Sequence, residues 1–200
     1  MILASHTILS AYGFWLPNDP RGSWSTFVGS WELLRFGEAT KVATHRSVAR
    51  VPHDHQLRLR AKRALKYPPV RFNGHQALSI ARGFSQAVKD GGYVLYACAI
   101  LPDHVHLVIA SHSRPFERIA GHLKSAATRQ LDADGLHPFP DAYNADGTRQ
   151  SPWGERAWHV FLDSHEDIVR AVRYVESNPV REGKRVQRWS FVTEYAKGTQ

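Results

Sequence analysis

The sequence predicts an α+β sandwich in which helices cover an antiparallel sheet. Strand-like and helix-like patterns follow the order strand, helix, strand, strand, helix, strand, helix along the chain. The helical segments repeat apolar residues every three to four positions, whereas the strand segments are short apolar runs bounded by turn residues. This mixture of strands and helices indicates α+β architecture.

The first half of the chain contains one strand, a long insertion and one clear helix. The strand is expected at 2–12, where apolar and polar residues alternate. An insertion of about 15–72 follows; it begins with loop-forming residues and contains one amphipathic helix near 54–66. A clearer helix is expected at about 75–89, because its apolar residues share one face and Gly91-Gly92 can stop it.

The second half begins with two apolar runs, at 93–100 and 105–111, which indicate an antiparallel pair of strands. A helix at about 113–131 comes next. A polar loop at about 132–152, rich in Asp, Gly and Pro, then leads to a short strand at 156–162.

The last predicted helix begins at Ser164, because Ser164-His165-Glu166-Asp167 has the form of a capping box. Pro179 is expected to end this helix near Asn178. The complete order is a split βαββαβ pattern of the ferredoxin-like type, with an added C-terminal helix and a basic insertion after the first strand. We therefore expect a single domain over 1–200.

Composition limits the cellular setting and the chemistry. A chain of 200 residues can build a real core. The one cysteine, Cys98, lies in an apolar run, so it excludes a disulfide framework or a cysteine-rich zinc site and fits a reducing compartment. No apolar stretch approaches the roughly 20 residues of a membrane helix, and the N-terminus lacks a signal-peptide pattern. We expect a soluble, cytoplasmic protein.

The positive charge is concentrated in one segment. The formal net charge is +8, and residues 41–71 hold nine of the 26 Lys and Arg but only one of the 18 acidic residues. A charge gathered in one place is expected of a protein that binds a polyanion. A basic, solvated helix face is the alternative. We favour nucleic acid as the partner, because a charge that serves only solubility would be spread over the chain.

The sequence His104-Val105-His106 begins a predicted strand. Residues i and i+2 of a strand project from one face, so both imidazoles are expected to point together while Val105 enters the core. Two neutral imidazoles side by side can hold a divalent metal. A second such pair, His53-Asp54-His55, has a charged centre and lies in a helix or loop, where its rings need not share a face.

Tyr174 and Asn178 lie four residues apart on the last predicted helix and are neighbours on one edge of it. Taken alone, Tyr174 is interpreted as a packing residue with its hydroxyl in water, and Asn178 as a helix-end residue.

Together the two motifs resemble the single-tyrosine transposases of the HUH superfamily, and the similarity is closest to the REP-associated tyrosine transposases. The resemblance is carried by Leu101-Pro102-Asp103-His104-Val105-His106-Leu107-Val108 and by Tyr174-Val175-Glu176-Ser177-Asn178-Pro179-Val180. It covers strand order and motifs from about 75 to 185, plus the opening strand. The insertion matches nothing in the family pattern.

The resemblance implies a metal-dependent enzyme that acts on DNA. His104, His106 and Asn178 would bind Mg²⁺ or Mn²⁺, and Tyr174 would be the nucleophile. The family cleaves single-stranded DNA near hairpins, leaves a 5′-phosphotyrosine and a free 3′-OH, and rejoins strands by the reverse attack. Its members include monomers and homodimers, and the sequence does not choose between them.

Further residues are expected to contact DNA. Five cations, three in the insertion and two on the helix after the histidine strand, could reach phosphates: Arg58, Lys62, Lys66, Lys124 and Arg129. Three tryptophans of the insertion could stack on unpaired bases or could equally anchor the loop: Trp15, Trp24 and Trp31.

Two other functions remain open at this point. One is a non-catalytic nucleic-acid-binding protein on the same fold, either a domesticated transposase or an RNA-binding module. The other, less favoured, is a zinc hydrolase, for which no third His, Cys or carboxylate has an obvious ligand spacing.

Overall fold

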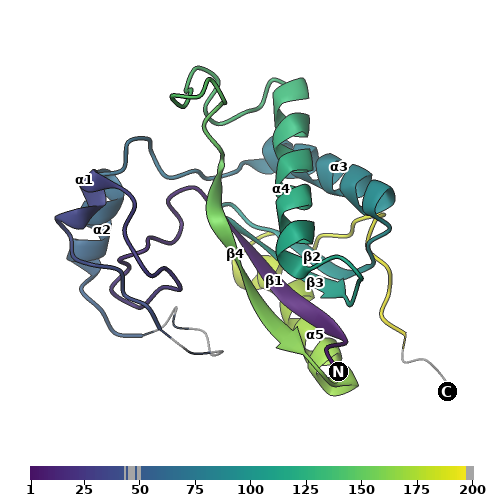
Figure 1. Ribbon diagram of the computed structural model, residues 1–200. Helices are drawn as coiled ribbons and strands as arrows, with labels where there is room; N and C mark the ends of the chain where they lie inside the picture. Colours follow the sequence, from purple (N-terminus) through teal and green to yellow (C-terminus); the bar gives the residue numbers. More distant parts are fainter. Residues whose placement is uncertain (43, 45–47, 49–50, 197–200) are drawn as a thin grey trace. The chain divides into compact units, whose positions relative to one another are not determined.

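The computed structural model describes residues 1–42, 44, 48 and 51–196 and divides into two compact units. The core unit comprises Met1–Ala11 and Arg71–Gln200, and the inserted unit comprises Tyr12–Val70. Figure 1 labels the helices and strands of both.

The core unit contains one four-stranded antiparallel sheet in the order β2-β3-β1-β4. Its elements, in chain order, are β1 (Ala4–Ala11), α3 (Gly74–Gly91), β2 (Leu95–Ile100), β3 (His104–Ala110), α4 (Phe116–Ala133), β4 (Trp153–Leu162) and α5 (His165–Arg181). This topology confirms the predicted split βαββαβ fold with an additional C-terminal helix.

Helices α3 and α4 cover one face of the sheet. Side chains of β3 alternate between the faces, and Val105, Leu107 and Ile109, which are fully buried, point to the α3/α4 side. The two helices pack closely because Gly83 of α3 has no side chain. A Cβ at that position would lie 2.6 Å from the Cα of Ala127 in α4.

Helix α5 covers the opposite face (Figure 1). Its apolar side chains Ile168 and Val175 are buried against Ala97 of β2 and Val108 of β3. Burial of these aliphatic groups holds α5 on the sheet face from which His104 and His106 also project.

Polar side chains fix where the helices begin. Asn73 and Gln76 form a reciprocal capping box at the start of α3. At the start of α5, the Ser164 side chain accepts a hydrogen bond from the backbone N–H of Asp167, as the sequence indicates.

The expected end of the last helix was wrong. Helix α5 continues through Pro179 to Arg181. The closing hydrogen bonds do not need the N–H that proline lacks, because the N–H of Glu182 donates to the Asn178 carbonyl and the N–H of Lys184 donates to the Pro179 carbonyl. Asn178 therefore lies inside the helix instead of at its end.

The described residues of the inserted unit form two short helices, α1 (Trp31–Leu34) and α2 (His55–Arg63), around a small apolar cluster that includes Leu16. The sequence predicts α2, with longer bounds, but it does not predict α1. Buried Asp19 binds the Arg21 guanidinium through both carboxylate oxygens, and that guanidinium lies 3.8 Å from the centre of the Trp15 ring.

In the part of the chain that the structure describes, no helix is long and apolar enough to cross a membrane.

Candidate active site

Two imidazoles of β3 meet on the α5 face of the sheet. His104 and His106 lie opposite Ser10 and Ile8 of β1, and their ring centres are 4.7 Å apart. Their Nε2 atoms are separated by 3.0 Å. The predicted convergence of the pair therefore follows from the period of the strand.

The outer nitrogen of each ring also has a partner. Nδ1 of His104 lies 2.7 Å from Oδ1 of Asp103, and Nδ1 of His106 lies 2.9 Å from Nε2 of His6. A carboxylate only accepts, so His104 donates from Nδ1 and its Nε2 carries a lone pair. The N–H of His106 Nε2 then donates to that lone pair, and His6 donates to His106 Nδ1.

His6 of β1 is the site residue that the sequence reasoning missed. It lies two residues along β1 from Ile8, opposite Val108, and its ring stacks on His106 with centres 5.1 Å apart. A signal existed, because a histidine at 6 interrupts the apolar residues expected on that face between Ala4 and Ile8. His6 bonds the far nitrogen of His106, so the three rings do not converge on one point.

Burial keeps two of these imidazoles neutral. Desolvation lowers the pKa of His6 to about 4. It also lowers the pKa of His106 well below its ordinary value, and the neighbouring His104 and His6 add to the shift. At neutral pH both rings are therefore neutral, which is the state in which an imidazole nitrogen can bind a cation in place of its hydrogen bond.

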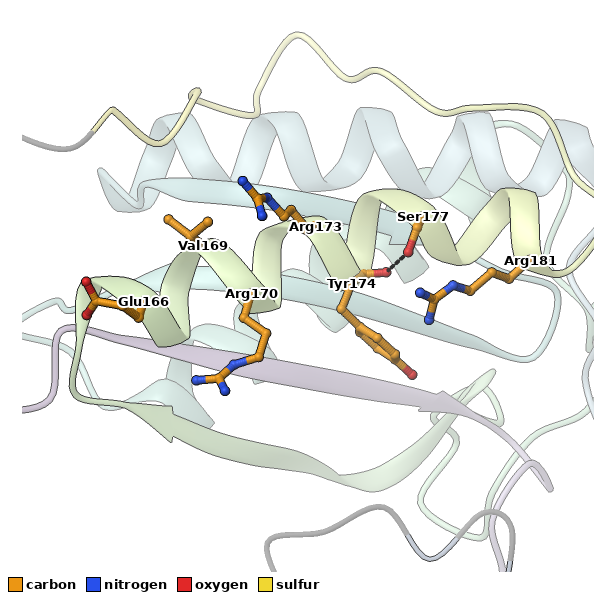
Figure 2. Close-up of a pocket in the computed structure, with 7 residues that line it drawn as sticks. All are labelled: Glu166, Val169, Arg170, Arg173, Tyr174, Ser177 and Arg181. Atoms are coloured by element: carbon orange, nitrogen blue, oxygen red, sulfur yellow. Dashed lines mark hydrogen bonds between the residues drawn. The ribbon is translucent and has the colours of Figure 1, made fainter.

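Tyr174 of α5 lies against this group. Its ring is edge-on to His106, with centres 5.5 Å apart, and to His6, with centres 5.6 Å apart. The side chain remains 41% exposed, so a phosphate could approach the phenol from solvent. In Figure 2 the phenol points away from the axis of α5, with Arg170 and Arg181 on either side of it along the helix.

Asn178 follows Tyr174 by one helical turn and is buried. Among the described residues its Nδ2 has no hydrogen-bond partner. A buried amide without a partner costs stability unless a ligand or solvent satisfies it. The unpartnered atom is a donor, so it would suit an acceptor such as a phosphate or water oxygen, whereas a cation could be bound only through the amide oxygen.

The donor set fits a divalent cation. Two ligand atoms about 2.1 Å from one octahedral ion, at right angles, lie about 3.0 Å apart, which is the separation of the two Nε2 atoms. Within the described ranges, no three side chains of the His, Cys, Asp and Glu types are grouped to hold a metal. A third protein ligand would have to be of another type, such as an amide oxygen.

The two DNA contacts predicted in the core unit do not lie at this site. Lys124 of α4 donates from Nζ to the carbonyls of Gly154 and Glu155, and burial lowers its pKa to about 8. Its ammonium therefore already fastens α4 to β4. Arg129 is exposed on α4, on the face of the sheet opposite Tyr174. Both remain predictions as DNA contacts.

In the inserted unit, Lys62 donates to the carbonyl of Phe14, Lys66 is exposed, and Nε of Arg58 is buried without a partner among the described residues. Of the basic positions counted in 41–71, Arg46 and Arg50 lie outside the described residues. Trp15 donates from its indole N–H to the Gly22 carbonyl and packs under Arg21, which favours its role as a loop anchor.

Comparison with known proteins adds one structural likeness. No protein-family model and no curated protein sequence matches the chain. A solved structure of the REP-associated tyrosine transposase bound to a REP hairpin is similar, at 19% sequence identity and a TM-score of 0.43. The likeness covers 60% of this chain and 64%, less than two thirds, of that chain.

Proposed function

We propose that this protein is a divalent-metal-dependent enzyme that cleaves and rejoins single-stranded DNA, with Tyr174 as the nucleophile. The observation that carries the proposal is the contact of an exposed tyrosine ring with His106, whose Nε2 faces the Nε2 of His104. The proposed nucleophile thus contacts one of the proposed metal ligands, although the two residues come from distant parts of the sequence.

The metal ligands would be His104, His106 and the amide oxygen of Asn178. A bound Mg²⁺ or Mn²⁺ would neutralise charge on the scissile phosphate and align it for in-line attack. Imidazole ligands suit Mn²⁺ better than Mg²⁺, which prefers oxygen. Asp103 and His6 would orient the two imidazoles through their outer nitrogens, as second partners of ligating histidines commonly do.

The reaction exchanges one phosphate ester for another. The phenolic oxygen of Tyr174 attacks the phosphorus and loses its proton, and the bond from phosphorus to O3′ breaks. The departing O3′ takes up a proton, which leaves a 3′-OH and a 5′-phosphotyrosine. Attack of a 3′-OH on the phosphotyrosine reverses the step and joins strands. Transposition at hairpin-associated sites is the use of this chemistry that we propose.

A second candidate is favoured by the hydrogen bonds of the site. The chain of contacts from Asp103 through His104 and His106 to His6 engages both nitrogens of His104 and His106 and one nitrogen of His6 without a metal. Such a closed network suits a non-catalytic nucleic-acid-binding protein, in which the histidines only stabilise the sheet.

A labelled hairpin oligonucleotide and a denaturing gel test the proposal. With Mn²⁺, the wild-type protein should form a covalent protein–DNA band, and Tyr174→Phe should form none while still binding DNA. The matched control is Tyr143→Phe, since Tyr143 is 53% exposed and outside the site. Both variants keep the aromatic ring, so stability should change by no more than about 0.5 kcal/mol.

Asn178→Ala should slow cleavage and recover partly at high Mn²⁺, because it removes a ligand and leaves the nucleophile in place. EDTA should abolish the band. A band that survives Tyr174→Phe moves the nucleophile elsewhere, and the absence of any band with wild-type protein and metal favours the non-catalytic candidate.

A further inference from the structure

A surface groove follows α5, and Tyr174 is one of its lining residues. Three arginines of the same helix line this α5 groove: Arg170, Arg173 and Arg181 (Figure 2). None of them belongs to the basic segment at 41–71 that the sequence singles out. The groove therefore places cations directly beside the nucleophile.

The arginines are arranged along the helix on both sides of Tyr174. At about 100° per residue, Arg170 and Arg181 lie within about 40° of Tyr174 around the helix axis, whereas Arg173 lies about 100° away and projects on the other side of the helix in Figure 2. At about 1.5 Å per residue they span about 17 Å along that axis. Successive phosphates of one stacked strand rise by about 3.4 Å, so this length covers several nucleotides.

Two of the three arginines that line the groove have no acidic partner among the described residues. Arg170 forms an ion pair with Asp167. In the described part of the chain, neither Arg173 nor Arg181 forms an ion pair, and both are exposed. The Arg181 guanidinium lies 5.7 Å from the centre of the Tyr174 ring. Glu166 stands at the N-terminal end, where its carboxylate would repel a phosphate and limit the site.

The opposite face of the core unit is less suited to bind the DNA strand that Tyr174 would cleave. Lys124 is engaged by two backbone carbonyls, and Arg129 lies on α4, with the sheet between it and α5. A phosphate bound at Arg129 could not be the one that is presented to Tyr174. Within the described residues, the α5 side offers both the phenol and exposed guanidinium groups in one groove.

We propose that the α5 groove binds the phosphodiester backbone of a single strand on both sides of the cleaved phosphate, with Arg181 as the principal contact and Arg170 and Arg173 as further contacts. Guanidinium groups match phosphate oxygens through paired N–H donors, so exposed arginines without an ion pair are well suited to this ligand. The position of the cleaved phosphate at Tyr174 rests on the proposed function, whereas binding of the backbone does not.

The test measures binding without cleavage. Fluorescence anisotropy with a labelled single-stranded oligonucleotide, in EDTA, gives the dissociation constant at several salt concentrations. Each phosphate that is no longer neutralised should make the slope of log affinity against log salt shallower by about 0.7, so Arg170→Gln/Arg173→Gln/Arg181→Gln should reduce it by up to about 2.1. Arg118→Gln, which removes an exposed arginine of α4, is the matched control and should leave the slope unchanged.

The decrease in affinity should not depend on sequence, because backbone contacts carry no base information. An unchanged slope in the triple variant, or an equal decrease in Arg118→Gln, overturns the proposal. Failure of the proposed function would look different: the wild-type protein would form no covalent band with metal, while the salt slope would still depend on the groove arginines.

Discussion

The two His-x-His sequences of this chain have the same spacing and different structures. His104 and His106 are two residues apart on β3 and project from the same face, so their ring centres lie 4.7 Å apart. His53 and His55 flank Asp54, the N-cap of α2, and their ring centres are 6.1 Å apart. His53 instead bonds the carbonyl of Val51. Backbone conformation, and not spacing, decides whether two such imidazoles can act together.

The largest expected difference between the pairs is in cleavage. His104→Ala or His106→Ala should abolish the covalent protein–DNA band, because each removes a proposed metal ligand. His53→Ala and His55→Ala should leave it intact. The gel assay for Tyr174 measures all four variants, and thermal melting checks that each is folded. Equal decreases in both pairs would contradict the assignment, and unfolding of His104→Ala would favour a structural role for that ring.

Substituting the middle residue of each His-x-His sequence should lower the free energy of unfolding by different amounts in the two pairs. Val105 is fully buried, so Val105→Asp places an unpaired carboxylate in the core and should destabilise the protein by more than about 4 kcal/mol. Asp54 accepts a hydrogen bond from the Leu57 N–H, so Asp54→Val should remove only a helix cap, at about 1 kcal/mol. Urea unfolding measures both, and similar decreases in stability would show that the two settings do not differ as described.

A smaller effect is expected at His6, which has no counterpart beside the second pair in the described part of the chain. His6→Ala removes the partner of His106 Nδ1 and should weaken Mn²⁺ binding by about 10- to 100-fold. His6→Gln, which can keep a hydrogen bond, should weaken it less. Titration of Mn²⁺ by electron paramagnetic resonance without DNA measures the affinity directly.

His159→Ala is the matched control for His6. His159 is also buried in the sheet, where it bonds the Thr7 hydroxyl on the α3/α4 face. It should lower stability and leave the Mn²⁺ affinity unchanged. If His159→Ala weakens Mn²⁺ binding as much as His6→Ala, then His6 acts only through the stability of the fold.

Local patterns in the sequence were sufficient for much of this structure. The order of strands and helices followed from apolar periodicity, and the start of α5 followed from Ser164. The shared face of His104 and His106 required only that 104–110 be a strand. Their contact with Tyr174 could not be derived from spacing; the resemblance of the two motifs suggested it.

Other features depend on contacts between distant residues. His6 meets His106 because β1 pairs with β3 in one particular register, which no local pattern encodes. Nζ of Lys124 donates to backbone carbonyls of β4. That strand begins at Trp153, three residues before the start at 156 that the sequence predicts. The continuation of α5 through Pro179 has a more local cause, since its closing hydrogen bonds come from Glu182 and Lys184. For His6 and Lys124, a distant partner in the fold decides what the side chain does.

The first and last residues of the inserted unit are hydrogen-bonded to each other. The N–H of Val70 donates to the carbonyl of Tyr12, so the unit leaves and re-enters the core at neighbouring points. A short turn could join those points with little cost in loop closure. A circular permutation or a transplanted domain could therefore be engineered at the same junction without interrupting any strand that carries the histidines.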